Sequence, residues 1–267
     1  MQVGISTACF YPDALEETFS HITDMGFKKI EIFFNTESEL HDPVISEIKN
    51  LVGENGLEVI SIHPYTSLME GMLLFSDYKR RTQDGFEQYK RYFEAAKKLG
   101  AKYLTFHGER LTPENKIDKK EVWERKIECY HRLCSIAKEF DVTVAQENVA
   151  WCKSSSPEYL KRLYEDVKEL RYTLDLKQGH RAGHVWTDYY NIIYDRLKNI
   201  HINDFDENHS CLLPSEGSFD YTEFFKRLKK DNYKGDVIIE VYKSNYNTKQ
   251  QLINSAEFLR NKINNNL

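Results

Sequence analysis

A chain of 267 residues with a net charge of −5 and no basic stripe is a poor match for a protein that holds DNA by neutralising phosphates. The length suits one large domain over residues 1–267, and the 40% apolar fraction is enough for a sizeable core. Five scattered cysteines without a CxxC pair indicate reduced thiols, and no run reaches the roughly 18 to 20 apolar residues of a membrane span, so a cytoplasmic protein is expected.

Short apolar runs alternate with helical patterns along the chain. Strands are expected at residues 3–10, 28–34, 57–63, 101–107, 142–147, 170–176, 198–205 and 236–242. Helical patterns between them include residues 14–25, 43–54, 77–99, 119–140 and 221–231. This alternation indicates βαβ units and a parallel sheet. Eight units favour an α/β fold, the closed (β/α)8 TIM barrel, in a single domain. No GxGxxG follows the first strand and no GxxxxGK[ST] occurs, so no nucleotide cofactor is expected.

Histidines and carboxylates gather where the predicted strands end, which is the active face of such a barrel. In chain order these residues are His63, His107, Glu147, Asp175, His201 and Glu240. The chain has only 9 histidines, so three of them at eight strand ends is more than chance would place there. The pattern therefore predicts a functional site at this rim of the barrel.

Glu147 ends an apolar strand, where a carboxylate costs free energy unless it is paired or does chemistry. The strands that carry Glu147, Asp175, His201 and Glu240 are neighbours in a barrel, so the four side chains should converge. Three carboxylates that close cannot all stay ionised without a cation. The sequence therefore predicts one divalent metal ion. Oxygen-rich ligation with one imidazole suits Mn²⁺, Mg²⁺ or Co²⁺, and Zn²⁺ stays open.

An ordered set of segments around these residues extends over nearly the whole chain. The segments are SIHPY (61–65), TFHGER (105–110), AQENV (145–149), TLDLKQ (173–178), HINDFD (201–206), LLPSEGSFDY (212–221) and IIEVY (238–242). The chain thereby resembles the xylose isomerase-like TIM barrel superfamily, also known as AP endonuclease family 2. That superfamily includes sugar isomerases, ketose 3-epimerases, inosose dehydratases and abasic-site nucleases of the endonuclease IV type.

The resemblance implies a metal quartet of Glu147, Asp175, His201 and Glu240, with Glu147 and Glu240 also acting as the acid–base pair. It implies a metal-dependent isomerase or epimerase acting on a sugar or sugar phosphate through a metal-stabilised enediolate. The expected partner is a small carbohydrate, with no nucleic acid and no membrane. The sequence leaves open which sugar is bound and whether it is phosphorylated. It also leaves open the choice among isomerase, epimerase and dehydratase, the identity of the metal, the presence of a second metal and the oligomeric state.

Two departures from the family pattern bear on the alternatives. The family often has Asp-x-x-His after the sixth strand, where this chain has Asp175-Leu-Lys-Gln178. The nuclease branch has Asp-x-His after the seventh strand, where this chain reads His209-Ser210-Cys211. Both changes favour a sugar isomerase or epimerase over an abasic-site nuclease or other phosphodiesterase. An inosose dehydratase-like lyase and a non-catalytic sugar-binding barrel remain as further alternatives.

Five further residues are expected to bind substrate in an enzyme with one metal. His63 and His107 follow the third and fourth strands, and Gln178 stands where the family has a histidine. Lys177 lies two residues past Asp175, so on a continuing strand it would point the same way and could stabilise an enediolate. Arg181 lies in a predicted loop after the sixth strand. Trp151 and Trp186 follow predicted strands, so either a sugar contact or core packing is open for them.

Overall fold

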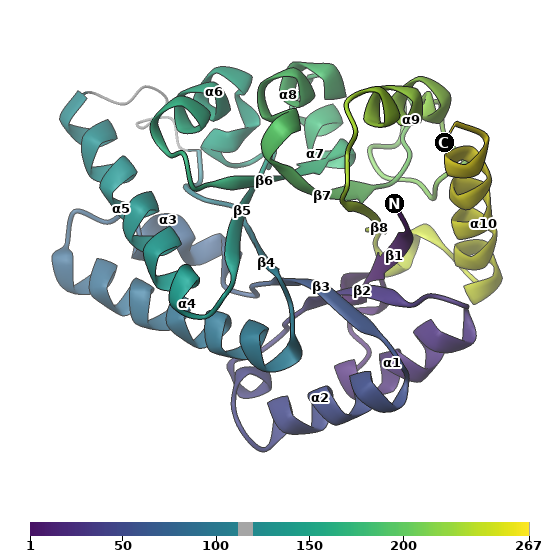
Figure 1. The fold of residues 1–267 in the computed structure, drawn as a ribbon, viewed down its shortest axis with the longest axis horizontal. Helices are drawn as coiled ribbons and strands as arrows, with labels where there is room; N and C mark the ends of the chain where they lie inside the picture. Colours follow the sequence, from purple (N-terminus) through teal and green to yellow (C-terminus); the bar gives the residue numbers. More distant parts are fainter. Residues whose placement is uncertain (112–119, 267) are drawn as a thin grey trace.

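Eight parallel strands close into a barrel in the order β1 to β8 in the computed structural model, which describes residues 1–111 and 120–266 (Figure 1). This confirms the predicted (β/α)8 fold. The strands are β1 Val3–Ser6, β2 Lys29–Phe33, β3 Glu58–His63, β4 Tyr103–Phe106, β5 Thr143–Glu147, β6 Arg171–Asp175, β7 Leu197–Ile202 and β8 Asp236–Ile239.

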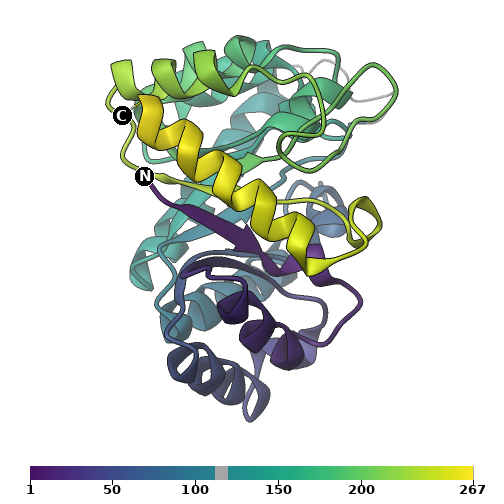
Figure 2. The ribbon, with the colours of Figure 1, turned by 90° about the vertical axis from the view of Figure 1, so that its right-hand side faces the viewer.

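Helices surround the barrel as an outer layer, and Figure 2 shows the last of them, α10, running alongside β1. The helices are α1 Leu15–Asp24, α2 Val44–Glu54, α3 Glu70–Leu73, α4 Lys79–Leu99, α5 Lys120–Glu139, α6 Pro157–Asp166, α7 Leu176–Arg181, α8 Trp186–Ile193, α9 Tyr221–Lys230 and α10 Lys249–Asn266. None of the helices within the described residues combines the length and the apolar character that crossing a membrane requires.

Three predicted strands, the first, the seventh and the eighth, are too long by three or more residues at their carboxyl ends. The seventh ends at Ile202 and not at residue 205. The first ends at Ser6, because a short 3₁₀ helix over Thr7–Phe10 follows and the Ser6 hydroxyl accepts a hydrogen bond from the Ala8 amide. The eighth ends at Ile239, although the Glu240 amide still donates to the Ile202 carbonyl of β7 at 3.2 Å. The helix predicted over 119–140 is present as α5, and residue 119 lies outside the described residues.

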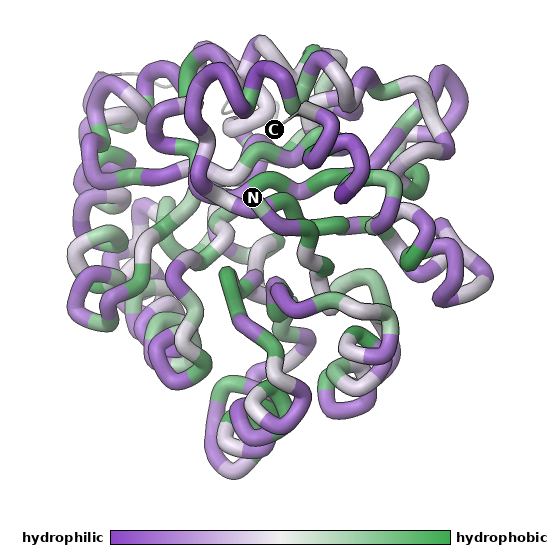
Figure 3. The backbone as a smooth tube through the Cα atoms, turned by 45° about the vertical axis from the view of Figure 1, so that its right-hand side comes forward, coloured by the Kyte–Doolittle hydropathy of each residue, from purple (hydrophilic) through white to green (hydrophobic). Residues whose placement is uncertain are grey.

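Side chains alternate along each strand between the helix layer and the barrel interior. The side chains that face the helix layer are apolar and fully buried, as Ile30, Ile32 and Ile200 show. Figure 3 shows the strands as hydrophobic beside helices of mixed character. The side chains that face the barrel interior include polar residues. Asn199 of β7 donates to Glu31 of β2 at 3.4 Å, and these strands are not neighbours, so the bond crosses the interior. The barrel therefore holds a buried polar layer.

Gly4 lies where β1 approaches its neighbours too closely for a side chain. A Cβ atom at Gly4 would lie 2.6 Å from the Lys29 carbonyl oxygen and 2.7 Å from Ile238 Cδ1. We expect Gly4→Ala to lower the free energy of unfolding by about 1–3 kcal/mol, because the clash can be relieved only by moving backbone.

The measurement is urea denaturation, with Gly53→Ala as the matched control. Gly53 lies in α2, and a Cβ there would meet nothing within 4 Å, so this change should be neutral or stabilising by up to about 1 kcal/mol. Equal effects of the two substitutions would contradict the close approach at β1.

Candidate metal centre

Four of the predicted residues meet at the carboxyl-terminal rim of the barrel. Glu147 ends β5, Asp175 ends β6, His201 lies in β7, and Glu240 directly follows β8. Each offers one ligand atom, and these four atoms all lie within 4.8 Å of one another. The strand register accounts for part of this, because Asp175 and His201 are direct partners across the β6–β7 pair. Convergence of the four side chains is thus a consequence of consecutive parallel strands.

The Nδ1 atom of His201 lies at the centre of the group. It is 3.0 Å from Glu147 Oε1, 3.4 Å from Glu240 Oε2 and 3.7 Å from Asp175 Oδ2. His201 has no exposed surface, and neither does Asp175. One imidazole nitrogen and three carboxylate oxygens therefore face a common point in a site largely shielded from water.

Burial and neighbouring charges shift the protonation of these groups. Burial raises the pKa of Asp175 to about 6, against the opposing charge of Lys177. Burial would also raise the pKa of Glu147, but the charge and hydrogen bond of His107 and the hydrogen bond of His201 hold that pKa well below its usual range. The carboxylates thus depend on the surrounding cationic groups for their ionisation.

A buried carboxylate oxygen and the types of donor atom show that these four residues fit a divalent cation. Asp175 Oδ2 is buried and receives no hydrogen bond from the described residues, which is costly for a carboxylate oxygen. Its other oxygen accepts a hydrogen bond from the Gln178 amide at 2.9 Å and caps α7. The donor set of three carboxylates and one imidazole matches the preferences of Mn²⁺, Mg²⁺, Co²⁺ and Zn²⁺. A buried group that could hold one metal ion is therefore present.

His63 and His107 form a second group with Glu147. His107 Nε2 lies 2.8 Å from Glu147 Oε2 and 2.9 Å from His63 Nε2, and the ligand atoms of all three residues lie within 4.8 Å of one another. Burial lowers the pKa of His107. Both histidines also line the cavity described below, and their expected role in substrate binding stays a prediction.

The structure corrects the strand backbone expected at Lys177, and the expected role of this side chain stays a prediction. The sixth strand ends at Asp175 and α7 begins at Leu176, because Asp175 caps this helix. Lys177 therefore lies in the first helical turn. Its ammonium is nevertheless 2.8 Å from Glu240 Oε2 and 3.5 Å from Asp175 Oδ2, with only 3% of the residue exposed. Burial would raise the pKa of Glu240, but the charges of His201 and Lys177 hold it well below its usual range.

Gln178 and Arg181 occupy the same short helix, so the predicted loop at Arg181 is also corrected. The Gln178 side-chain oxygen accepts a hydrogen bond from the Ala150 amide at 3.2 Å, and Gln178 lines the cavity. Arg181 is the last residue of α7 and is exposed. It donates to the Ser210 hydroxyl at 2.9 Å and to the Tyr242 hydroxyl at 2.7 Å, away from the four clustered ligand atoms.

The two tryptophans separate into different environments. Trp151 lines the cavity and meets the His107 ring edge-on, with ring centroids 5.2 Å apart. Trp186 packs edge-on against Phe224 at 5.0 Å in the helix layer. His209 is exposed and contacts Asp206 at 2.9 Å. Trp151 is therefore the aromatic residue of this set that lies at the site.

A cavity of about 660 Å³ opens onto the clustered residues. Aromatic rings form much of its wall, and its polar groups include Glu147, Glu240, Lys177 and the two histidines. The aromatic lining residues are Tyr11, Phe33, Tyr65, Trp151 and Tyr242. A concave wall with aromatic rings and a few converging polar groups is typical of a small-molecule site.

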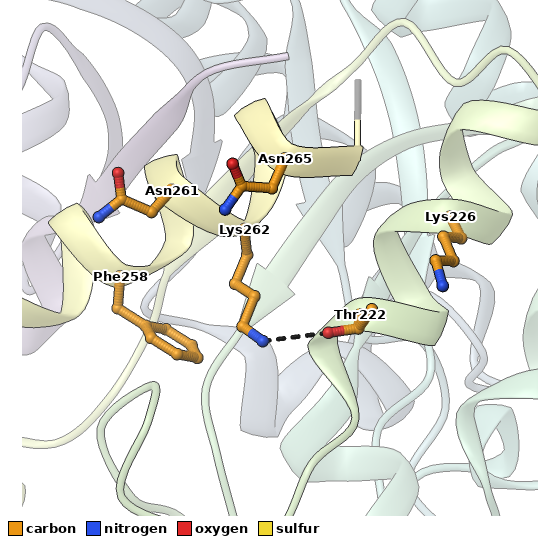
Figure 4. Close-up of a pocket in the computed structure, with 6 residues that line it drawn as sticks. All are labelled: Thr222, Lys226, Phe258, Asn261, Lys262 and Asn265. Carbon is orange, nitrogen blue, oxygen red and sulfur yellow. Dashed lines mark hydrogen bonds between the residues drawn. The ribbon is translucent and has the colours of Figure 1, made fainter.

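A second cavity of about 430 Å³ lies between α9 and α10 (Figure 4). Its residues are Thr222, Lys226, Phe258, Asn261, Lys262 and Asn265, and Lys262 donates to the Thr222 hydroxyl at 3.0 Å. None of the residues predicted for the site lies there. Those predicted site residues that line a cavity line the one at the barrel rim.

Glu31 contacts the site, although the sequence pattern did not predict it there. It lies in β2 with no exposed surface, and its Oε2 atom is 3.1 Å from His201 Nε2. The signal was present in KIEIF, a glutamate inside an apolar strand, which is the same signal that drew attention to Glu147. Glu31 lies in the middle of its strand, two residues before the end, whereas the site was predicted from residues at strand ends.

A family model described as xylose isomerase-like TIM barrel matches residues 19–262. The chain belongs to this family. Among curated relatives of the xylose isomerase-like barrels, 3-dehydro-D-guloside 4-epimerase of Escherichia coli (strain K12) is 25% identical over 262 residues, covering 90% of this chain and 92% of that protein. That relative is an epimerase, in agreement with the predicted isomerase or epimerase class.

Solved structures of this barrel family share the fold. An L-ribulose 3-epimerase matches with a TM-score of 0.83 at 18% identity, covering 100% of this chain and 96% of that one. The IolI protein, solved with a binding zinc atom, matches with a TM-score of 0.79 at 18% identity, covering 100% of this chain and 99% of that one. At these identities the likeness is one of fold.

Proposed function

We propose that this protein is a divalent-metal-dependent sugar epimerase or isomerase. The observation that carries the proposal is the meeting of three carboxylates and one imidazole, of which Glu147 and Glu240 also line an aromatic-walled cavity. Glu147, Asp175, His201 and Glu240 would hold one ion of Mn²⁺, Mg²⁺, Co²⁺ or Zn²⁺. The curated relative that acts on a 3-dehydro-guloside supports a carbohydrate substrate carrying a carbonyl group.

The metal would supply a positive charge that polarises a sugar carbonyl and acidifies the neighbouring C–H bond. Glu147 and Glu240 then divide the proton transfer. They arise from β5 and the end of β8, three strands apart in an eight-stranded barrel, so they approach a substrate between them from different sides. One glutamate, as the carboxylate, removes the carbon-bound proton, and the other, entering the step in its protonated form, gives its proton to the opposite face. Proton exchange with solvent then restores both side chains.

Other residues position the substrate in this proposal. His63 and His107 place imidazole nitrogens beside Glu147, and Trp151 offers a ring face to a sugar. Lys177 provides a buried ammonium next to Glu240, where it can stabilise negative charge on a substrate oxygen. Gln178 lines the cavity and Arg181 donates to Tyr242, which also lines it, so both would contact the more distant part of a substrate.

Solvent exchange tests the proposal. The protein is incubated in deuterium oxide with Mn²⁺ and a panel of free ketoses, phosphorylated ketoses and keto-glycosides, and deuterium at carbon is followed by NMR. We expect incorporation at a carbon beside the carbonyl, and its loss when the metal is chelated. No incorporation across the panel by Mn²⁺-loaded protein would contradict the proposal.

A phosphodiesterase is the second candidate, because His63, His107 and Glu147 form a group that could hold another metal ion. His209 is exposed and pairs with Asp206, so it does not join that group. Metal analysis separates the two candidates, since one tightly bound ion per chain supports the epimerase and three would support the nuclease-type centre.

Lys177→Met should separate substrate chemistry from metal binding. The ammonium lies 2.8 Å from Glu240 and 3.5 Å from Asp175, where it repels a cation held by the same carboxylates. We expect Mn²⁺ affinity to rise by about 3- to 10-fold while kcat/KM falls by about 10²-fold, because charge stabilisation at the substrate is lost. Isothermal titration and steady-state kinetics measure the two effects. A parallel fall of both would assign Lys177 a purely structural role.

A further inference from the structure

Glu31 is a carboxylate enclosed in the barrel below the candidate metal ligands. It has no exposed surface, and a buried charge of this kind is tolerated only with hydrogen-bond donors around it. The Oε2 atom is 2.7 Å from the Ser61 hydroxyl, 2.9 Å from the Thr105 hydroxyl and 3.4 Å from the Asn199 amide nitrogen. Donors from β3, β4 and β7 therefore hold this carboxylate from across the interior.

The same oxygen also meets the imidazole ring of His201. Glu31 Oε2 lies 3.1 Å from His201 Nε2, on the side of the ring facing away from the other carboxylates. The opposite nitrogen, Nδ1, faces Glu147, Asp175 and Glu240. Nδ1 also lies 3.0 Å from a Glu147 oxygen, so without a metal ion both ring nitrogens face carboxylates, which only accept hydrogen bonds. A metal ion at Nδ1 would take the place of the proton there, and the contact with Glu31 keeps the remaining ring proton on Nε2.

We propose that Glu31 is a positioning residue of the metal centre, fixing His201 in the tautomer and orientation that present Nδ1 to the metal ion. The inference rests on the proposed function, since it gives His201 a metal to bind. Glu31 touches neither substrate nor the other three ligands in this arrangement; it acts through the ring. A carboxylate behind a ligating imidazole also makes the imidazole a stronger donor to the metal.

The hydrogen-bond network explains how the ring is held. Ser61 also accepts a hydrogen bond from the Asn199 amide at 3.2 Å, so the donors to Glu31 are linked with one another. Asn199 and His201 lie two residues apart on β7 and both face the interior. The carboxylate is thus fixed at several points, and the imidazole can rotate only by giving up its bond to Glu31.

The first test measures metal affinity in Glu31→Gln, which keeps the side-chain volume and removes the charge. We expect Mn²⁺ to bind about 10- to 100-fold more weakly, as measured by the free-Mn²⁺ signal in electron paramagnetic resonance. Glu39→Gln is the matched control, because Glu39 is also buried but accepts hydrogen bonds from Asn35 and Thr36 outside the metal group. Its Mn²⁺ affinity should stay within about threefold of the original protein.

The second test needs no variant at Glu31, so it stands even if Glu31→Gln does not fold. Nitrogen-15 NMR of the Zn²⁺-loaded protein reports which imidazole nitrogen binds metal, with the His201 signals identified by their loss in His201→Gln. We expect Nδ1 to be metal-bound and Nε2 to carry a proton that exchanges slowly with solvent.

Metal bound through Nε2, or unchanged Mn²⁺ affinity in folded Glu31→Gln, would overturn the role of Glu31 and leave the proposed function standing. Failure of the original protein to bind either ion would overturn both. Loss of affinity in Glu39→Gln equal to that in Glu31→Gln would also overturn the inference, because any buried glutamate would then have the same effect.

Discussion

Glu147→Gln should lower kcat by about 10³-fold or more at saturating Mn²⁺, because the glutamine cannot accept a proton from the substrate carbon. Its amide oxygen can still act as a weak ligand, so excess metal keeps the site loaded. Glu147 is the residue that joins the two candidate groups, since it contacts His201 at 3.0 Å and His107 at 2.8 Å. Steady-state kinetics with the substrate found in the exchange screen measure the effect.

A sharper form of this experiment compares Glu147→Gln with Glu240→Gln. If the two glutamates serve opposite faces of the sugar, each variant keeps one base. Each should then exchange deuterium into only one of the two epimers without interconverting them. Exchange into both epimers by either variant would show that a single base serves both faces.

Glu39→Gln serves as the control for this pair as well. Glu39 is buried and belongs to the short helix over Glu37–Leu40, outside the clustered ligands. We expect its kcat and exchange pattern to match those of the original protein. A comparable loss in the control would assign the effect to a disturbed fold.

Metal loading should stabilise the fold strongly. An ion that binds only the folded chain adds about 4 kcal/mol when it is present at 1,000 times its dissociation constant. The physical reason here is specific, because the ion would relieve repulsion among three buried carboxylates and satisfy Asp175 Oδ2. We expect the Tm to rise by about 10 °C on adding Mn²⁺ to chelator-treated protein.

His201→Gln is the matched variant for this measurement. Its side chain still fills the barrel interior, but one ligand of the quartet is lost and the contact with Glu31 is altered. The Mn²⁺-dependent rise in Tm should shrink to about a third or less. An equal rise in His201→Gln would place the stabilising ion somewhere else on the protein.

The sequence predicted the fold and the convergence of the four residues because both follow from strand order. Parallel strands in a barrel place their carboxyl ends on one rim, so Glu147, Asp175, His201 and Glu240 needed only correct strand assignments. Errors of a few residues in the predicted strand ends did not change which four residues were expected to converge. Glu240 lies just beyond β8 and still reaches the group.

Other features depended on local backbone that periodicity does not report. Lys177 was expected on a strand, but Asp175 caps a helix that starts at the next residue, and the lysine reaches Glu240 from a helical turn. Glu31 was missed because its partners come from strands far apart in the chain. Only the closed barrel brings Ser61, Thr105 and His201 around it.

Anomalous scattering from a crystal soaked in Mn²⁺ tests the metal centre most directly. We expect one strong peak per chain, coordinated by Glu147, Asp175, Glu240 and Nδ1 of His201. An empty quartet at saturating Mn²⁺, or a strong peak held by His63 and His107 in its place, would contradict it.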